Sequence, residues 1–120
     1  EPNWPVITVL HNLRRAGSEC WIWTGRSDEC KSATLDWLRE YKLVGALADP
    51  DLWPVGAPER FRMRRADDYR PDEALKFDWL SQIEPPEYCR LIGVFDDRQK
   101  VVDMWRSAGI ACFQVAPGDF

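Results

Sequence analysis

The sequence has one histidine, no Cys-x-x-Cys spacing and no hydrophobic run that approaches the length of a membrane span. Its first residues also lack the charge pattern and apolar segment of a signal peptide, so we expect a cytoplasmic protein without a membrane partner. His11 lies off the apolar face of its predicted helix, which favours a solvent-facing or partly packed role over catalysis. The formal charge of −4 argues against nucleic-acid binding over the whole surface, but it allows a local basic patch.

The composition is that of one soluble globular domain. The chain has 120 residues, of which 45% are hydrophobic and 30% charged, so we expect a single domain over residues 1–120. An irregular excursion is expected at about 43–58, where prolines and glycines interrupt any periodicity. Four cysteines are expected to be reduced thiols rather than a disulfide framework or a zinc site: Cys20, Cys30, Cys89 and Cys112.

Predicted helices alternate with predicted strands along the chain. This order predicts an α/β fold with a mostly parallel sheet, whose strands deliver polar residues to one edge. The hydrophobic spacing indicates helices at about 5–16, 30–41, 71–83 and 101–108, and strands at about 19–23, 60–64, 91–95 and 110–115.

Two adjacent acids, Asp96 and Asp97, follow the apolar run at 91–95 and precede a helical pattern. Ligands of parallel sheets lie beyond the carboxyl ends of the strands, which is where this pair is expected. Neighbouring carboxylates repel each other, and a divalent cation such as Mg²⁺ would neutralise them. The alternative is that Asp97 only caps the helix, and the pair alone leaves both interpretations open.

A second cluster of polar residues follows the first predicted strand. Thr24, Gly25 and Arg26 would bring a hydroxyl, a close backbone approach and a guanidinium to one turn, which suits a phosphoryl group. A plain turn would need only the glycine. Lys76 lies early in a predicted helix, against the usual dipole preference, so it is either exposed or held by an anion.

A basic stretch lies in the middle of the chain. Its arginines either form a solvated charged surface or contact an anionic substrate, and both readings stay open: Arg60, Arg62, Arg64, Arg65 and Arg70.

These motifs together resemble the second, third and fourth motifs of the haloacid dehalogenase (HAD) superfamily of phosphohydrolases. More narrowly, several stretches look like the 3′-phosphatase domain of bacteriophage polynucleotide kinase-phosphatase. They are Met63-Arg64, Asp68-x-Arg70-x-Asp72-x-x-x-Lys76, Phe95-Asp-Asp-Arg-Gln-Lys-Val-Val-Asp-Met-Trp-Arg106 and Gln114-Val-Ala-Pro-Gly-Asp-Phe120. The resemblance spans nearly the whole chain and implies a Rossmann-like three-layer sandwich.

The resemblance also implies roles for individual residues. Thr24, Lys76 and Asp97 would be catalytic, contacting the phosphoryl oxygens, neutralising charge and orienting water. Asp96 would bind Mg²⁺. Substrate would be bound by Gly25, Arg26, Arg64 and Arg70. The implied reaction removes phosphate from nucleic-acid 3′ ends or nucleotides through an aspartyl-phosphate, in a protein that can also carry a kinase domain or form oligomers.

One motif of the family has no counterpart. The Asp-x-Asp-Gly-Thr strand that supplies the nucleophile does not occur in the sequence. That strand is central in the family, and without it two neighbouring strands would expose apolar edges. We therefore expect a preceding segment, or another chain, to supply it. Two alternative functions stay open: a phosphatase of a small metabolite, and an inactive domain that binds a partner through its arginines and tryptophans.

Overall fold

The computed structural model describes residues 2–43 and 60–119 and divides the chain into two compact units. We call Glu1–Asp68 the N-terminal unit and Tyr69–Phe120 the C-terminal unit, and each is described by itself. The single-domain expectation stays a prediction, and the predicted excursion at 43–58 lies outside the described residues except for Leu43. None of the described helices is long and apolar enough to cross a membrane.

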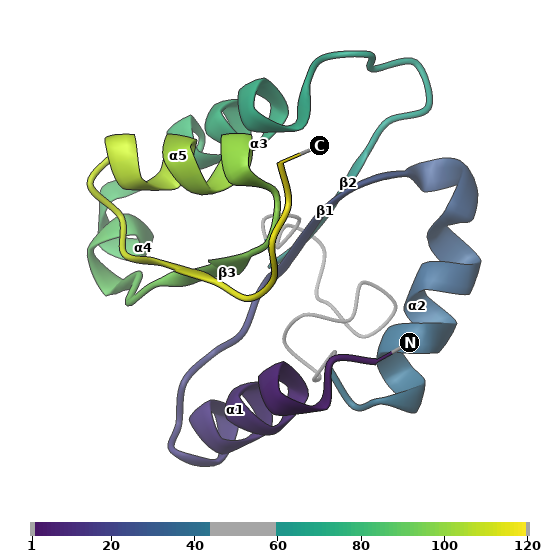
Figure 1. Cartoon of the computed structure of the whole chain (residues 1–120), viewed down its shortest axis with the longest axis vertical. Helices are drawn as coiled ribbons and strands as arrows, with labels where there is room; N and C mark the ends of the chain where they lie inside the picture. The colour runs from purple at the N-terminus through teal and green to yellow at the C-terminus, as the bar shows by residue number, and fades with distance from the viewer. Residues whose placement is uncertain (1, 44–59, 120) are drawn as a thin grey trace. The chain divides into compact units, whose positions relative to one another are not determined.

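Both units combine helices with a pair of parallel strands (Figure 1), which confirms the predicted α/β class. The N-terminal unit contains α1 (Trp4–Arg15), β1 (Ile22–Ser27), the 3₁₀ turn η1 (Asp28–Cys30), α2 (Lys31–Glu40) and β2 (Phe61–Arg64). The C-terminal unit contains α3 (Asp72–Ser81), α4 (Pro85–Arg90), β3 (Val94–Asp96), α5 (Gln99–Ser107) and β4 (Cys112–Gln114).

The N-terminal unit is built around a small hydrophobic core. Asn3 begins α1 by accepting a hydrogen bond from the backbone N–H of Val6, and Gly17 follows its end with a φ of +99°. His11 is partly buried and its Nε2 lies 3.0 Å from the carbonyl oxygen of Tyr41, so it has a packed role. The buried hydrophobic side chains come from α1, α2, the segment just after α2 and β2: Ile7, Leu35, Leu38, Leu43 and Phe61.

The pairing of β1 with β2 has one irregularity. Ile22, Trp23 and Thr24 pair with successive residues of β2, but the next pair joins Ser27 to Arg64. Gly25 and Arg26 are therefore extra residues on β1 and form a bulge. We name residues 24–27 the Thr24 bulge. The strand prediction at 19–23 was wrong at both ends, because β1 begins later and continues through the residues expected to form a turn.

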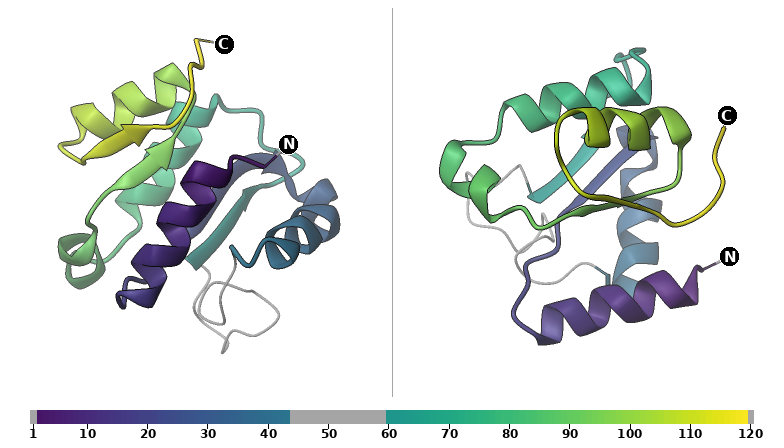
Figure 2. Two further views of the ribbon diagram at one scale, coloured as in Figure 1. Left: turned by 60° about the horizontal axis from the view of Figure 1, so that its bottom comes forward. Right: turned by 60° about the vertical axis from the view of Figure 1, so that its left-hand side comes forward.

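In the C-terminal unit, α3 and α5 lie side by side (Figure 2) and carry most of its buried side chains. Val101, Val102 and Trp105 recur on the buried face of α5, as their spacing predicted. The strand expected at 91–95 is shorter, because α4 precedes it and Ile92 is 75% exposed. Other buried residues of the unit are Leu75, Lys76, Trp79, Leu80, Ile110 and Cys112.

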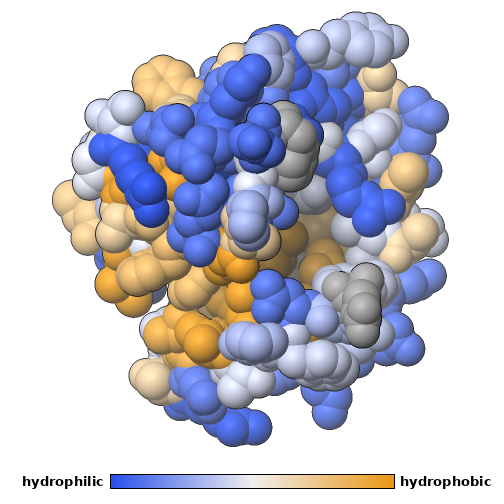
Figure 3. Space-filling view, in the orientation of Figure 1, coloured by the Kyte–Doolittle hydropathy of each residue, from blue (hydrophilic) through white to orange (hydrophobic). Residues whose placement is uncertain are grey.

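Several large hydrophobic residues of the C-terminal unit reach the surface. They include Phe77 and Phe113, and Phe113 stacks on Phe95 with ring centroids 5.1 Å apart. Figure 3 shows hydrophobic and hydrophilic residues side by side on one face of the molecule. The four cysteines are free, as predicted. Burial raises the pKa of the Cys112 thiol, and the nearby charge of Asp96 raises it further, so this thiol stays protonated at neutral pH.

Candidate active site

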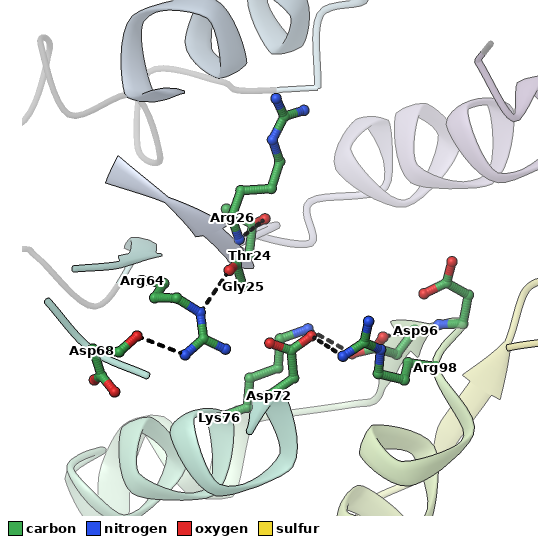
Figure 4. Close-up of polar contacts among 10 residues, drawn as sticks. Thr24, Gly25, Arg26, Arg64, Asp68, Asp72, Lys76, Asp96 and Arg98 are labelled. Atoms are coloured by element: carbon green, nitrogen blue, oxygen red, sulfur yellow. Dashed lines mark hydrogen bonds and ion pairs between the residues drawn. The ribbon is translucent and has the colours of Figure 1, made fainter. Parts of the chain in front are cut away.

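Lys76 and Asp96 form a buried ion pair in the C-terminal unit (Figure 4). Nζ of Lys76 lies 3.0 Å from Oδ2 of Asp96, and the two side chains are only 9% and 10% exposed. Lys76 follows the buried Leu75 on α3, and Asp96 is the last residue of β3. Of the two predicted environments for Lys76, the anionic one is confirmed, and its partner is one of the predicted acids. The acid pair therefore has a basic partner that local sequence does not reveal.

Asp96 accepts hydrogen bonds on both carboxylate oxygens. Oδ2 accepts from Lys76 and also from the indole Nε1 of Trp105 at 3.3 Å, while Oδ1 accepts from the backbone N–H of Asp97 at 2.9 Å. Trp105 is only 2% exposed and lies on the buried face of α5. Three donors from three segments therefore fix the orientation of one carboxylate, and a buried charge needs such partners.

Asp97 lies just beyond β3 and is exposed. The helix-capping interpretation is wrong, because the residue that caps α5 is Arg98 and it makes no side-chain capping bond. The last described segment holds the main chain of Asp97 instead. Nε2 of Gln114 donates to the Asp97 carbonyl oxygen at 3.2 Å, and the backbone N–H of Gln99 donates to the carbonyl oxygen of Gly118.

Gly118 packs directly against the acid loop. A Cβ atom at this position would lie 2.2 Å from the carbonyl oxygen of Asp97 and 3.0 Å from Cα of Arg98. Because both atoms belong to the backbone, they cannot move aside as a flexible side chain could. The absence of a side chain at Gly118 thus allows the chain end to support the loop that presents Asp97.

Two further ion pairs connect α3 to its surroundings within the same unit. NH1 of Arg98 lies 3.1 Å from Oδ2 of Asp72, with side chains 34% and 21% exposed, so the residue after the acid pair is tied to the first turn of α3. Arg70, predicted to bind substrate, instead lies 3.1 Å from Asp78 in a more exposed pair. A substrate would have to compete with Asp78 for this guanidinium.

In the N-terminal unit, the Thr24 bulge is held by hydrogen bonds to its own backbone. The Thr24 hydroxyl oxygen accepts from the backbone N–H of Arg26 at 3.2 Å. Nε of Arg64 donates to the Gly25 carbonyl oxygen at 2.9 Å, and its NH1 donates to the Asp68 carbonyl oxygen at 3.1 Å. Thr24, which was expected to be catalytic, and Gly25 and Arg64, which were expected to bind substrate, thus help to build the strand pair. The side chain of Arg26 is exposed.

Two further arginines, Arg60 just before β2 and Arg62 within it, also have partners. Arg60 pairs with Glu19 at 2.8 Å, and the guanidinium of Arg62 lies 5.8 Å from the ring centroid of Trp23. The two predicted alternatives were a solvated surface and a substrate-binding surface. Arg60 and Arg62 have a third environment, because both contact side chains of their own unit.

The structure thus brings Lys76 to Asp96 in one unit, and Thr24 and Gly25 to Arg64 in the other. The expected meeting of these two sets at one sheet edge stays a prediction, as do their catalytic and substrate-binding roles. Among residues 2–43 and 60–119, no three His, Cys, Asp or Glu side chains form a cluster that could hold a metal alone. Trp105, Gln114 and Gly118 were not among the predicted site residues, although all three lie in stretches that carry the family resemblance.

Comparisons with known proteins identify the family to which the chain belongs. The family model of the HAD-type phosphatase domain of the polynucleotide kinase PNKP matches residues 1–120. The chain belongs to this family. Two chains from solved structures of the Pnkp1/Rnl/Hen1 RNA repair complex are similar to the whole chain, with 30% and 29% identity and TM-scores of 0.78 and 0.79. The chain spans only about a third of their length, covering 34% and 37% of them.

Membership of the family confirms the predicted resemblance and the HAD-like α/β fold. It also gives the chain a phosphatase-type role. Among the described strands, β1 pairs only with β2 and β3 only with β4. Each described pair therefore has strand edges without a described partner strand, and a further strand could add there. Such an addition would stabilise the pair, because two strands alone are only marginally stable.

Proposed function

We propose that this chain is most of a Mg²⁺-dependent phosphatase domain that removes phosphate from nucleic-acid 3′ ends or nucleotides. The observation that carries the proposal is the buried Lys76–Asp96 pair at the end of β3, with the exposed carboxylate of Asp97 next to it. An acid held by three donors beside an exposed acid is a preorganised arrangement. Phosphoryl transfer depends mainly on such positioning and on neutralising the charge of the phosphate oxygens.

Lys76 supplies the fixed positive charge in this proposal. An ammonium group is a compact point charge, and its position on Asp96 keeps it in place without a bound phosphate. Two of its three N–H donors are not used by that bond, so they can donate to a phosphoryl oxygen or to the nucleophile. The nucleophile itself is expected on the strand with the Asp-x-Asp-Gly-Thr motif, which does not occur in these residues.

Magnesium fits the two acids. Each carboxylate oxygen has two lone pairs, and within the described part of the chain Oδ1 of Asp96 accepts only from the Asp97 N–H, so one position stays open for a cation. Asp97 is exposed and offers further oxygen atoms, one of which would orient water. Mg²⁺ prefers oxygen ligands and commonly binds through one or two carboxylates with substrate phosphate and water, so a three-residue protein cluster is not required. When bound, it would neutralise charge on the phosphoryl group.

The Thr24 bulge is proposed to contact the substrate. The Thr24 hydroxyl accepts one bond and still has its own hydrogen to donate to a phosphoryl oxygen. The exposed Arg26 is suited to a directional, bidentate contact with substrate oxygens. Arg64 would position Gly25, and Arg70 would contact a polyanionic substrate after leaving Asp78.

The similarity to chains of an RNA repair complex supports a nucleic-acid substrate over a small metabolite. We propose that the parent protein acts in RNA repair in the cytoplasm, and that a kinase domain or assembly partners accompany the chain there.

The test is phosphate release by the natural protein that contains this chain. Substrates would be a 3′-phosphorylated oligonucleotide, a 3′-mononucleotide and a sugar phosphate, each with Mg²⁺ and with EDTA. The proposal expects the highest kcat/KM for the oligonucleotide and no turnover in EDTA. Preferred turnover of the sugar phosphate would favour a metabolite phosphatase, and no turnover of any substrate would favour an inactive binding domain.

A further inference from the structure

Oδ2 of Asp96 has no acceptor capacity left. A carboxylate oxygen has two lone pairs, and Oδ2 accepts from Nζ of Lys76 at 3.0 Å and from Nε1 of Trp105 at 3.3 Å. Among the described residues, Oδ1 accepts only from the backbone N–H of Asp97. The two oxygens of the same carboxylate are therefore different: one is filled, and the other has a free position.

Trp105 is the donor that creates this difference. Without its indole N–H, Oδ2 and Oδ1 would each accept one bond, and either oxygen could turn toward a cation. Trp105 is only 2% exposed and lies beside Val101 and Val102, which are completely buried. The indole is therefore held by the core of α5, and it cannot follow the carboxylate if Asp96 rotates.

We propose that Trp105 is a positioning residue that makes Asp96 a one-oxygen ligand, so that only Oδ1 is offered to a cation. The inference rests on the proposed Mg²⁺ site and adds a residue to it. Partners that orient a metal-binding carboxylate typically contribute about 10–100-fold to metal affinity or activity. The buried N–H and the buried ammonium thus act together, because each occupies one lone pair of the same oxygen.

The test replaces Trp105 by Phe, which keeps an aromatic ring in the core but removes the N–H. The matched control is Val102→Ala, which creates a cavity on the same buried face of α5 while leaving the indole donor in place. Both would be made in the natural protein. Mg²⁺ affinity would be measured by calorimetry without substrate, thermal stability by calorimetric unfolding, and turnover as a function of Mg²⁺ concentration.

We expect Trp105→Phe to weaken Mg²⁺ binding about 10–100-fold and to raise the Mg²⁺ concentration needed for half-maximal kcat, with KM for the oligonucleotide little changed. Val102→Ala should lower Tm but leave Mg²⁺ affinity unchanged. If Trp105→Phe binds Mg²⁺ as tightly as the natural protein, or if Val102→Ala loses as much affinity, the proposal is wrong. If the natural protein binds Mg²⁺ but releases no phosphate, the phosphatase function fails while the calorimetric comparison still decides the role of Trp105.

Discussion

The two units hold their candidate site residues by different means. In the C-terminal unit, the charges of Lys76 and Asp96 are buried and neutralise each other. In the N-terminal unit, Arg64 instead donates to the carbonyl oxygens of Gly25 and Asp68 and supports the backbone of a strand bulge, while Arg26 stays exposed. The C-terminal unit therefore has a preorganised site of buried charges. The N-terminal unit presents the exposed cation of Arg26 on a strand bulge whose main chain is held by Arg64.

Breaking the buried Lys76–Asp96 pair should change the free energy of unfolding more than any other substitution considered. Asp96→Asn leaves the ammonium of Lys76 buried without a counter-charge, so we expect it to lower the free energy of unfolding by about 3–5 kcal/mol. The measurement is denaturant unfolding of the natural protein and the variant.

The matched control for this variant is Asp78→Asn. Asp78 also pairs with a cation, Arg70, but the two side chains are 43% and 46% exposed. Exposed pairs contribute at most about 1 kcal/mol, so the control should unfold close to the natural protein. If both variants lost the same free energy of unfolding, the buried Lys76–Asp96 pair would contribute no more to stability than the exposed Arg70–Asp78 pair.

Gly118→Ala should have the next largest effect. The new Cβ would overlap the Asp97 carbonyl, so the acid loop or the chain end must move, at a cost of about 1–3 kcal/mol. The exposed Ala116→Ser is the control from the same segment. Thermal unfolding measures the stability change, and a crystal structure of the variant would show whether Asp97 moves. A variant with unchanged Tm and an unmoved loop would contradict the close packing.

The smallest stability effects are expected in the N-terminal unit. Arg64→Ala removes two hydrogen bonds to main-chain carbonyls, so it should lower the free energy of unfolding by about 1–2 kcal/mol. Arg26→Ala should leave Tm unchanged, because its side chain is exposed.

Binding to a phosphorylated oligonucleotide tests whether the exposed Arg26 contacts substrate. If Arg26 contacts a substrate phosphate, Arg26→Ala should flatten the slope of log affinity against log salt by about one unit. Arg15→Ala is a control, since Arg15 is an exposed arginine at the end of α1. Equal slopes for the natural protein and Arg26→Ala would remove Arg26 from the substrate site.

Local patterns predicted the parts of the fold that depend on neighbours in sequence. The spacing of Val101, Val102 and Trp105 predicted α5, and alternation along 60–64 predicted a strand where β2 lies. Pro85 and Pro86 show an ambiguity of such patterns, because proline ends a preceding helix and also suits a first helical turn, and α4 begins there.

The sequence could not reveal contacts between distant residues. Lys76 and Asp96 are 20 positions apart, and nothing in either neighbourhood specifies the other. Trp105 was predicted to be buried, but periodicity does not show where an indole N–H points. Pairing with β2 places the Thr24 bulge inside β1, and that pairing joins segments about 40 residues apart.

The central claim is that the acid pair at the end of β3 serves a metal-dependent phosphatase. Asp97→Asn tests it most directly, because Asp97 is exposed and its replacement does not disturb the Lys76–Asp96 pair. The measurement is Mg²⁺-dependent phosphate release from a 3′-phosphorylated oligonucleotide, with Tm recorded for each preparation. We predict an unchanged Tm and a loss of turnover of about 100-fold or more, the scale of a positioned acid–base group. A folded Asp97→Asn protein with undiminished turnover would contradict the account.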